Sequence, residues 1–144
     1  MKIEKMQNKH LCAVAEIAAA SLAEAWSEKA FEQELSNPSA TIFVAVSGDE
    51  TVGFGGVQKV LDEAYINNIA VKDSFRRKGA GAAILNAIVK DCTGCAFVTL
   101  EVRVSNIAAI KLYEKSGFVS QGIRKGFYSH PTEDANIMTL FLGE

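Results

Sequence analysis

Hydrophobic and polar residues alternate along several short segments of the chain, and in others the hydrophobic residues recur every three or four positions. Alternation is typical of half-buried strands, and the longer spacing is typical of helices packed on a core. The pattern predicts strands at 1–6, 40–47, 51–60, 64–71, 96–104, 118–129 and 135–142. It predicts helices at 8–22, from Ser27 onward, at 80–91 and at 106–116.

Polar residues and glycines mark the ends of these predicted helices. Ser27 and Ser105 precede two of them, and a serine hydroxyl can accept a hydrogen bond from the free N–H groups of a first turn. Gly117 follows the last helix, where a left-handed residue commonly ends a helix. These signals predict where the second helix begins, and where the fourth helix begins and ends.

The order of elements, β-α-α-β-β-β-α-β-α-β-β, predicts the fold class. It is typical of an α/β or α+β protein with a mixed, mostly antiparallel sheet and flanking helices. The strand at 64–71 reaches the strand at 96–104 through a helix, so we expect these two to be parallel. With 144 residues, the chain is expected to form a single domain, 1–144.

Composition excludes several classes of partner. Hydrophobic residues make up 49% and charged residues 22%, as in globular proteins, and the net charge is −2. This charge gives no broad attraction to nucleic acid or to anionic membranes, so we expect neither as a partner. The most apolar run, 11–26, contains Glu16 and Glu24 and is not a membrane span. The N-terminus is polar and carries no signal peptide, so a cytoplasmic protein is expected.

Three cysteines are present, and two of them form a C-x-x-C at Cys92 and Cys95. Redox-active pairs sit at helix N-termini, whereas this pair follows a predicted helix. A zinc site needs a second ligand pair at suitable spacing, and none appears; His10 and His130 could join Cys92 and Cys95 only through an accident of folding. We therefore expect ordinary buried thiols and no metal.

The junction at 76–82 carries the clearest chemical signal. Arg76, Arg77 and Lys78 run into Gly79 and Gly81 at the start of a predicted helix. A helix N-terminus presents unpaired N–H groups and a positive dipole end, and glycine allows a ligand to approach the backbone. The sequence therefore predicts a phosphate or pyrophosphate site here.

The type of phosphate ligand follows from the glycine spacing. A Walker loop is missing, and a dinucleotide fingerprint would have to follow a strand directly. The run instead fits R-x-x-G-x-G at Arg76, Gly79 and Gly81. With "INNIAV" before it and "LEVRVSNIAAIKLYEKSGF" after it, the chain resembles the GCN5-related N-acetyltransferases over nearly its whole length. The resemblance is greatest to bacterial ribosomal-protein-alanine N-acetyltransferases, in "WSEKAF", "VLDEA", "NIAV", "LEVRVSN" and "EDANIM".

The resemblance implies acetyl-CoA as co-substrate. It assigns the pyrophosphate to backbone N–H groups at 77–82, and the pantetheine arm to the main chain at 69–71, paired like an added strand. The expected cofactor-binding residues are Ile69, Ala70, Val71, Arg76, Arg77, Lys78, Gly79, Ala80, Gly81, Ala82 and Asn106.

Two residues are candidates for the chemistry of amine acetylation. Glu101 lies opposite the apolar positions of its strand and can act as the base that frees the amine, directly or through water. From spacing alone, a solvated strand-end acid paired with Arg103 would be the better interpretation, and the resemblance is what favours the base. Tyr113 lies two helical turns after Asn106, and the resemblance assigns it as the acid for the leaving thiolate. Without the resemblance, it could be a core aromatic.

The acceptor side is assigned by resemblance to Trp26 and Tyr128. The implied acceptor is a protein N-terminus, most simply the N-terminal alanine of a ribosomal protein. Three alternatives stay open: a small amine such as a polyamine or aminoglycoside as acceptor, a non-catalytic acetyl-CoA-binding module, and a nucleotide-binding module. The sequence does not set the oligomeric state.

Overall fold

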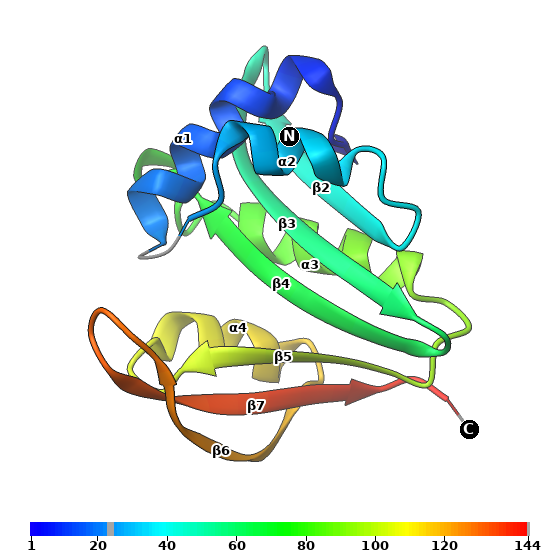
Figure 1. Cartoon of the computed structure of the whole chain (residues 1–144), viewed down its shortest axis with the longest axis vertical. Helices are drawn as coiled ribbons and strands as arrows, with labels where there is room; N and C mark the ends of the chain where they lie inside the picture. Colours follow the sequence, from blue (N-terminus) through cyan, green and yellow to red (C-terminus); the bar gives the residue numbers. More distant parts are fainter. Residues whose placement is uncertain (23–24, 144) are drawn as a thin grey trace.

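The computed structural model describes residues 1–22 and 25–143, and within them the strands form one seven-stranded sheet (Figure 1). In spatial order the strands are β1 (Lys2–Lys5), β2 (Ala40–Ser47), β3 (Glu50–Val60), β4 (Glu63–Val71), β5 (Phe97–Arg103), β7 (Glu133–Phe141) and β6 (Val119–Tyr128). Neighbouring strands are antiparallel except β4 and β5, which are parallel. The predicted mixed, mostly antiparallel sheet with one parallel crossover is confirmed.

Two helices cover one face of the sheet. These are α1 (Leu11–Ser21), which follows a 3₁₀ turn at Asn8–His10, and α2 (Glu28–Glu34). They bury Val14, Ile17 and Phe31 against Val44 and Phe54 of β2 and β3. Of the apolar run at 11–26, residues 23 and 24 lie outside the described residues. Over the described ranges, no helix combines the length and hydropathy needed to cross a membrane.

The other face carries α3 (Ala80–Asp91) and α4 (Ile107–Lys115), with a 3₁₀ turn at Asp73–Phe75 before α3 (Figure 1). Ile84 and Ile88 of α3 are fully buried in this core. The helix lies close to β3 at Gly55, where an added Cβ would be 2.5 Å from Ile84 Cγ2. Glycine at this position therefore sets how closely α3 packs on the sheet.

The predicted start of α2 and the predicted end of α4 are correct. The Ser27 hydroxyl accepts a hydrogen bond from the α2 backbone, and Gly117 ends α4 at a φ of +99°. The prediction that Ser105 begins α4 is wrong. Asn106 is the capping residue, since its Oδ1 accepts from the Ala109 N–H at 3.3 Å.

The parallel strands separate along their length. β4 and β5 are paired at three positions only, from Glu63 with Phe97 to Tyr65 with Thr99. Beyond these pairs each strand continues, β4 to Val71 and β5 to Arg103, and the two diverge (Figure 1). The separation leaves the β5-facing edge of β4 without a partner strand and opens the centre of the sheet.

Candidate active site

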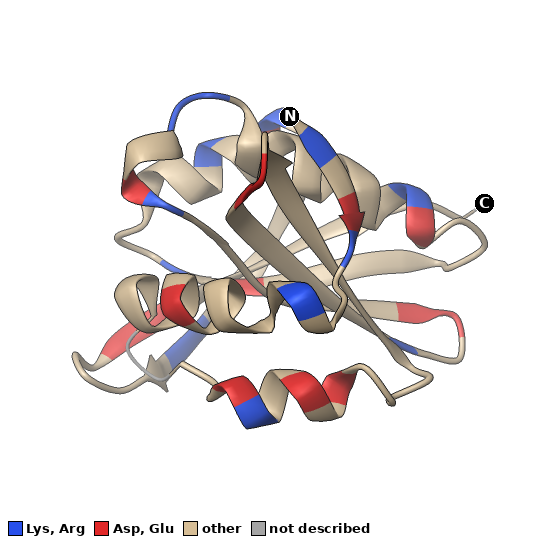
Figure 2. Cartoon of the chain, turned by 90° about the horizontal axis from the view of Figure 1, so that it is seen from above, with Lys and Arg blue, Asp and Glu red and all other residues tan. Residues whose placement is uncertain are grey.

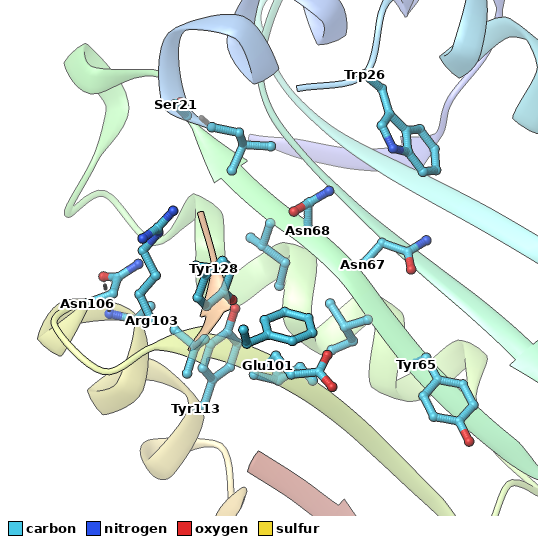
Figure 3. A pocket seen from close by; sticks show the side chains of 17 residues that line it. Ser21, Trp26, Tyr65, Asn67, Asn68, Glu101, Arg103, Asn106, Tyr113 and Tyr128 are labelled. Atoms are coloured by element: carbon cyan, nitrogen blue, oxygen red, sulfur yellow. Dashed lines mark hydrogen bonds between the residues drawn. The ribbon is translucent and has the colours of Figure 1, made fainter. Parts of the chain in front are cut away.

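A cavity of about 640 Å³ lies where β4 and β5 diverge. Its lining comes from both strands, from α4, from the hairpin between β6 and β7, and from the end of α1 with the segment that follows it (Figure 3). Residues from five parts of the chain thus meet at the opening in the sheet. Six predicted site residues line it: Trp26, Ile69, Glu101, Asn106, Tyr113 and Tyr128.

A β-bulge in β4 shapes one wall. Gly56 of β3 opposes Asn68 and the next residue opposes Ile66, so Asn67 is an extra residue in the strand. A bulge turns consecutive side chains out of strict alternation. Asn67 and Asn68 both line the cavity, and neither was a predicted site residue. Two adjacent asparagines inside a strand pattern were the available sequence signal.

The main chain at 69–71 lies at the separated edge of β4. Its partners in β3 occupy one edge, from Gly53 with Val71 to Gly55 with Ile69, whereas the ladder with β5 has already ended at Tyr65. Backbone groups on the other edge can therefore pair with an extended ligand. The Val71 carbonyl accepts from Arg76 Nε at 3.2 Å.

The N-terminus of α3 has the geometry expected of an anion site. Gly79 precedes the helix at a φ of +86°, and a Cβ added there would meet no atom within 4 Å. The Ala83 N–H donates to the Gly79 carbonyl at 3.0 Å, so the amides before Ala83 have no acceptor within the helix. Arg77 also has a positive φ, +64°. This open, amide-lined turn fits a pyrophosphate.

The basic side chains beside this turn have local partners. The Arg76 guanidinium pairs with Asp73 at 2.7 Å, and Lys78 Nζ lies 5.4 Å from the Phe75 ring centroid. Gly81 lies against α4, since an added Cβ would be 3.4 Å from Leu112 Cδ2. Within this turn, the backbone is thus more open to a ligand at Gly79 than at Gly81.

Glu101 lies on β5 and lines the cavity, and its side chain is about one-third exposed. The side chains of Val98, Leu100 and Val102 point to the core, as the alternation predicts. The pairing with Arg103 considered from the sequence is not formed. Instead, Glu101 Oε2 accepts from Arg124 Nη1 of β6 at 3.3 Å. No local sequence signal links these two strands.

Tyr113 is both a core aromatic and a cavity residue. It is 7% exposed and packs on Phe118, with ring centroids 5.7 Å apart. Burial, with a smaller contribution from the nearby Tyr128, raises the pKa of Tyr113 to about 12. Its phenol therefore stays protonated throughout the neutral range. Figure 3 shows Tyr113, Tyr128 and Glu101 grouped in the same part of the cavity.

The two predicted acceptor residues lie on opposite walls. Trp26 packs on Phe31 with ring centroids 5.4 Å apart and is 37% exposed, so it is partly core and partly cavity (Figure 3). Tyr128 lies in the hairpin with the Arg103 guanidinium 4.4 Å above its ring. Burial, and then the Glu101 carboxylate, raises the pKa of Tyr128. Phe127, beside it, also lines the cavity and was not predicted.

The C-x-x-C lies away from this cavity. Cys92 is fully buried and Cys95 is 8% exposed. Burial, and then Cys95 beside it, raises the pKa of Cys92 to about 11, which keeps the thiol protonated at neutral pH. Within 1–22 and 25–143, no group of three or more His, Cys, Asp or Glu side chains is arranged to hold a metal ion.

The chain belongs to the acetyltransferase (GNAT) family, because residues 11–118 match the model of that family. It is therefore an acetyltransferase that uses acetyl-CoA, as predicted. The separated strands and the open turn at Gly79 fit this donor, since they offer unpaired main-chain groups to its pantetheine arm and pyrophosphate.

Two relatives and one crystal structure show which members of this family the chain is similar to. The [ribosomal protein bS18]-alanine N-acetyltransferase of Escherichia coli K12 is 40% identical over 121 residues, which cover 80% of each chain. A Bacillus subtilis protein described as a candidate for that enzyme is 35% identical over 99% of this chain and 96% of its own. The crystal structure of the Escherichia coli ribosomal-protein-S18-alanine N-acetyltransferase superposes with a TM-score of 0.89 and 35% identity, over 99% of this chain and 94% of that one.

Proposed function

We propose that this chain transfers the acetyl group of acetyl-CoA to the α-amine of the N-terminal alanine of a ribosomal protein of the bS18 type. The observation that carries the proposal is the convergence of Glu101 and Tyr113 on one cavity, at the point where β4 and β5 diverge. The acceptor follows from the relatives, which are named for that alanine and that ribosomal protein. Such an acceptor implies action in the cytoplasm.

The donor lies between the separated strands. Backbone N–H groups at 77–82 bind the pyrophosphate, helped by the dipole of α3. The edge of β4 at 69–71, which has no partner strand there, binds the pantetheine arm, and a backbone N–H there stabilises the oxyanion. Asn106 binds the same arm through its amide nitrogen, because its Oδ1 is already engaged with the Ala109 N–H.

Glu101 is the base. An α-amine has a pKa of about 8, so much of it is protonated at neutral pH and cannot attack the thioester. The Glu101 carboxylate removes this proton, directly or through water. Arg124 holds the carboxylate from the β6 side at 3.3 Å. The acceptor ammonium approaches the same carboxylate from the cavity.

Tyr113 serves the leaving sulfur. Its phenol has a pKa of about 12, whereas a thiol has an ordinary pKa of about 8.5. Full transfer from the phenol alone is therefore uphill, and Tyr113 first donates a hydrogen bond to the sulfur. As the carbon–sulfur bond breaks, the phenol gives its proton to the sulfur and regains one from the nitrogen that has attacked. The proton that the ammonium gave to Glu101 leaves to solvent, so the products are the N-acetyl amide, the free thiol of CoA and one proton.

Trp26 and Tyr128 hold the acceptor from opposite walls of the cavity. Asn67 and Asn68 offer amide groups beside them, suited to the polar backbone of a peptide. A polyamine would be better served by several carboxylates. Among the described residues that line the cavity, Glu101 is the one acid, and it is accompanied by the cation Arg103. This lining favours a peptide acceptor.

The base role is tested with Glu101→Gln. The amide keeps the shape and loses the basic oxygen, so kcat/KM at neutral pH should fall about 100-fold, which is typical of a lost general base. The control is Glu114→Gln, an exposed acid on α4, which should behave like the unmodified chain. Equal rates for Glu101→Gln and its control would remove Glu101 from the mechanism.

A further inference from the structure

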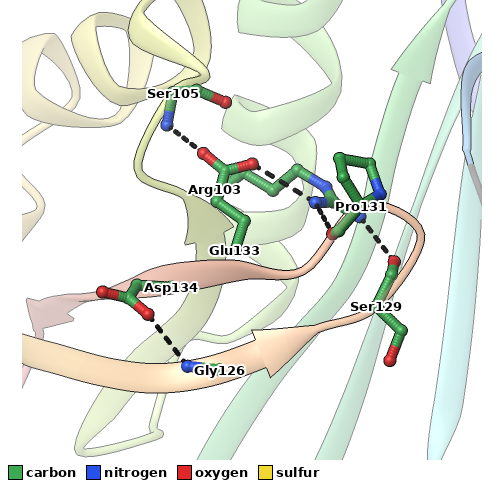
Figure 4. Close-up of polar contacts among 7 residues, drawn as sticks. All are labelled: Arg103, Ser105, Gly126, Ser129, Pro131, Glu133 and Asp134. Carbon is green, nitrogen blue, oxygen red and sulfur yellow. Dashed lines mark hydrogen bonds and ion pairs between the residues drawn. The ribbon is translucent and has the colours of Figure 1, made fainter.

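Arg103, which lines the cavity, is the centre of a polar network (Figure 4). Its Nη1 donates to the Pro131 carbonyl at 2.9 Å and to Glu133 Oε1 at 3.2 Å. Its Nη2 donates to the Ser129 carbonyl at 3.1 Å. One guanidinium thus ties β5 to the turn between β6 and β7.

The network reaches both halves of the site. On the acceptor side, the guanidinium lies 4.4 Å from the centroid of the Tyr128 ring. On the donor side, Glu133 Oε2 accepts from the Ser105 N–H at 2.7 Å, one residue before Asn106 begins α4. A hydrogen bond from the Ser105 side chain, followed by the Ser105 backbone N–H and by Arg103, holds the pKa of Glu133 below its ordinary value.

The backbone ladder alone does not fix this end of the hairpin. β6 and β7 pair at Arg124 with Ala135 and then only at Tyr128 with Glu133, and the register shifts between these pairs. Gly126 is held there by a side chain, through its N–H to Asp134 Oδ1 at 2.9 Å (Figure 4). The orientation of Tyr128 therefore depends on side-chain contacts.

The side chains of Arg103 and Glu133 are well shielded for an ion pair near the surface, at 23% and 17% exposed. Charge-assisted bonds in such surroundings are stronger and more directional than exposed ones. Arginine suits the position, because a planar fork can serve two carbonyls and a carboxylate while it stacks on an aromatic ring.

We propose that Arg103 and Glu133 form a positioning pair, in which Arg103 orients Tyr128 for the acceptor and Glu133 sets the start of α4, and so Asn106, for the donor. This inference rests on the proposed roles of Tyr128 and Asn106. The two halves of the cavity are thereby aligned by one ion pair, although neither member need touch a reacting atom.

The hairpin half is tested with Arg103→Met. The variant removes all three hydrogen bonds of the guanidinium, and even one charge-assisted bond corresponds to about a tenfold effect. The KM for the acceptor peptide should therefore rise at least about tenfold, while the Kd for acetyl-CoA stays within about twofold. Lys125→Met, an exposed cation on the same hairpin, is the matched control and should leave both constants unchanged. Equal changes in both constants, or no change in acceptor KM, would overturn the proposal.

The helix half is tested with Glu133→Ala and Glu133→Gln. Alanine removes the acceptor of the Ser105 N–H and should weaken acetyl-CoA binding as well as acceptor binding. Glutamine keeps an oxygen for that N–H and should spare the donor. If both variants leave the Kd for acetyl-CoA unchanged, the donor half of the proposal is wrong. Where Arg103→Met fails to fold, Arg103→Lys replaces it. The KM for the acceptor should then rise by a smaller factor, again with the Kd for acetyl-CoA unchanged.

A readout without an acceptor separates this inference from the proposed function. With fluorotyrosine incorporated, the ¹⁹F resonance of Tyr128, assigned with Tyr128→Phe, should shift in Arg103→Met while that of Tyr65 stays in place. A shifted resonance together with no acetylation of any alanine peptide would sink the proposed acceptor and keep the positioning pair. An unshifted Tyr128 resonance would sink the pair.

Discussion

Tyr113 belongs both to the hydrophobic core and to the proposed active site. Its ring packs on Phe118 in the core, whereas its edge lines the cavity. The same burial raises its pKa to about 12, so the phenol remains a hydrogen-bond donor from neutral pH through the mildly alkaline range in which the acceptor amine becomes free. The role of Tyr113 thus depends on being enclosed.

The variant Tyr113→Phe distinguishes the packing role of Tyr113 from its catalytic role. Phenylalanine keeps the ring contact and removes the donor, so we expect kcat to fall about 100-fold, within the usual range for a lost proton donor. The Kd for acetyl-CoA and the melting temperature should change little. Single-turnover kinetics, calorimetric binding and thermal melts measure these quantities. An unchanged kcat would assign Tyr113 to the core alone.

The raised pKa of Tyr113 also predicts how stability depends on pH. Below about pH 10 the residue is protonated in both the folded and unfolded states. Above that, the unfolded chain releases the proton while the folded one holds it up to about 12, so the free energy of unfolding falls as pH rises. The loss is about 1.4 kcal/mol per pH unit, or about 3 kcal/mol over this window.

Denaturant unfolding between pH 9 and pH 12 measures this loss, with Tyr113→Phe as the comparison. The difference in slope between the two proteins isolates Tyr113 from the other groups that titrate there, such as Cys92. Parallel pH curves for the two proteins would show that Tyr113 ionises equally easily when folded.

At the residue scale, sequence reasoning found the residues whose spacing follows one element. Alternation within β5 places Glu101 off the apolar face, and helical spacing places Tyr113 two turns after Asn106, but their chemical roles came from the resemblance to the acetyltransferases. It did not find Arg124 or Asn67. The Arg124 contact joins β6 to β5 across the sheet, and Asn67 lines the cavity because of a bulge that alternation does not encode.

Among the elements, α3 determines the donor site, and its position depends on neighbouring glycines of β3. Gly55 faces the helix, where an added Cβ would meet Ile84 at 2.5 Å and Ile88 at 3.1 Å. Gly56 faces the other side, where the nearest atom would be Ile42 Cγ1 at 3.5 Å, an ordinary contact. A side chain at Gly55 would thus collide with α3, whereas a methyl group at Gly56 would fit.

Gly55→Ala and Gly56→Ala form a matched pair. Overpacking a core costs about 1–3 kcal/mol, so Gly55→Ala should lower the free energy of unfolding by about 2 kcal/mol. It should also weaken acetyl-CoA binding, because α3 must move off the sheet. Gly56→Ala should change stability by less than about 1 kcal/mol. Denaturant unfolding measures the two free energies of unfolding. Equal decreases for the two variants would contradict the proposed packing of α3 on Gly55.

The elements themselves could largely be predicted from the sequence. The helix at 80–91 and the strand at 40–47 occur with the bounds that periodicity gives. The start of α4 was placed one residue early, because Ser105 and Asn106 are both good capping residues and a tertiary contact decides between them. Glu133 of β7 takes the Ser105 N–H, which leaves the capping role to Asn106.

For the whole molecule, the divergence of β4 from β5 is the feature on which donor and acceptor binding both depend. The element order predicts the parallel crossover that joins these strands, but not that their pairing ends after three positions. Basic and acidic residues are interspersed in the view of Figure 2, so the electrostatics that matter are local to the cavity and to the turn at Gly79.

The central claim is that this cavity acetylates the α-amine of an N-terminal alanine. The most direct measurement is mass spectrometry of an alanine-initiated basic peptide with internal lysines after incubation with acetyl-CoA, beside the same peptide with a blocked N-terminus and a set of polyamines. The account predicts one acetyl group, on the α-amine of the free peptide, and no product from the others. Acetylation of lysine side chains, of the blocked peptide or of polyamines would contradict it.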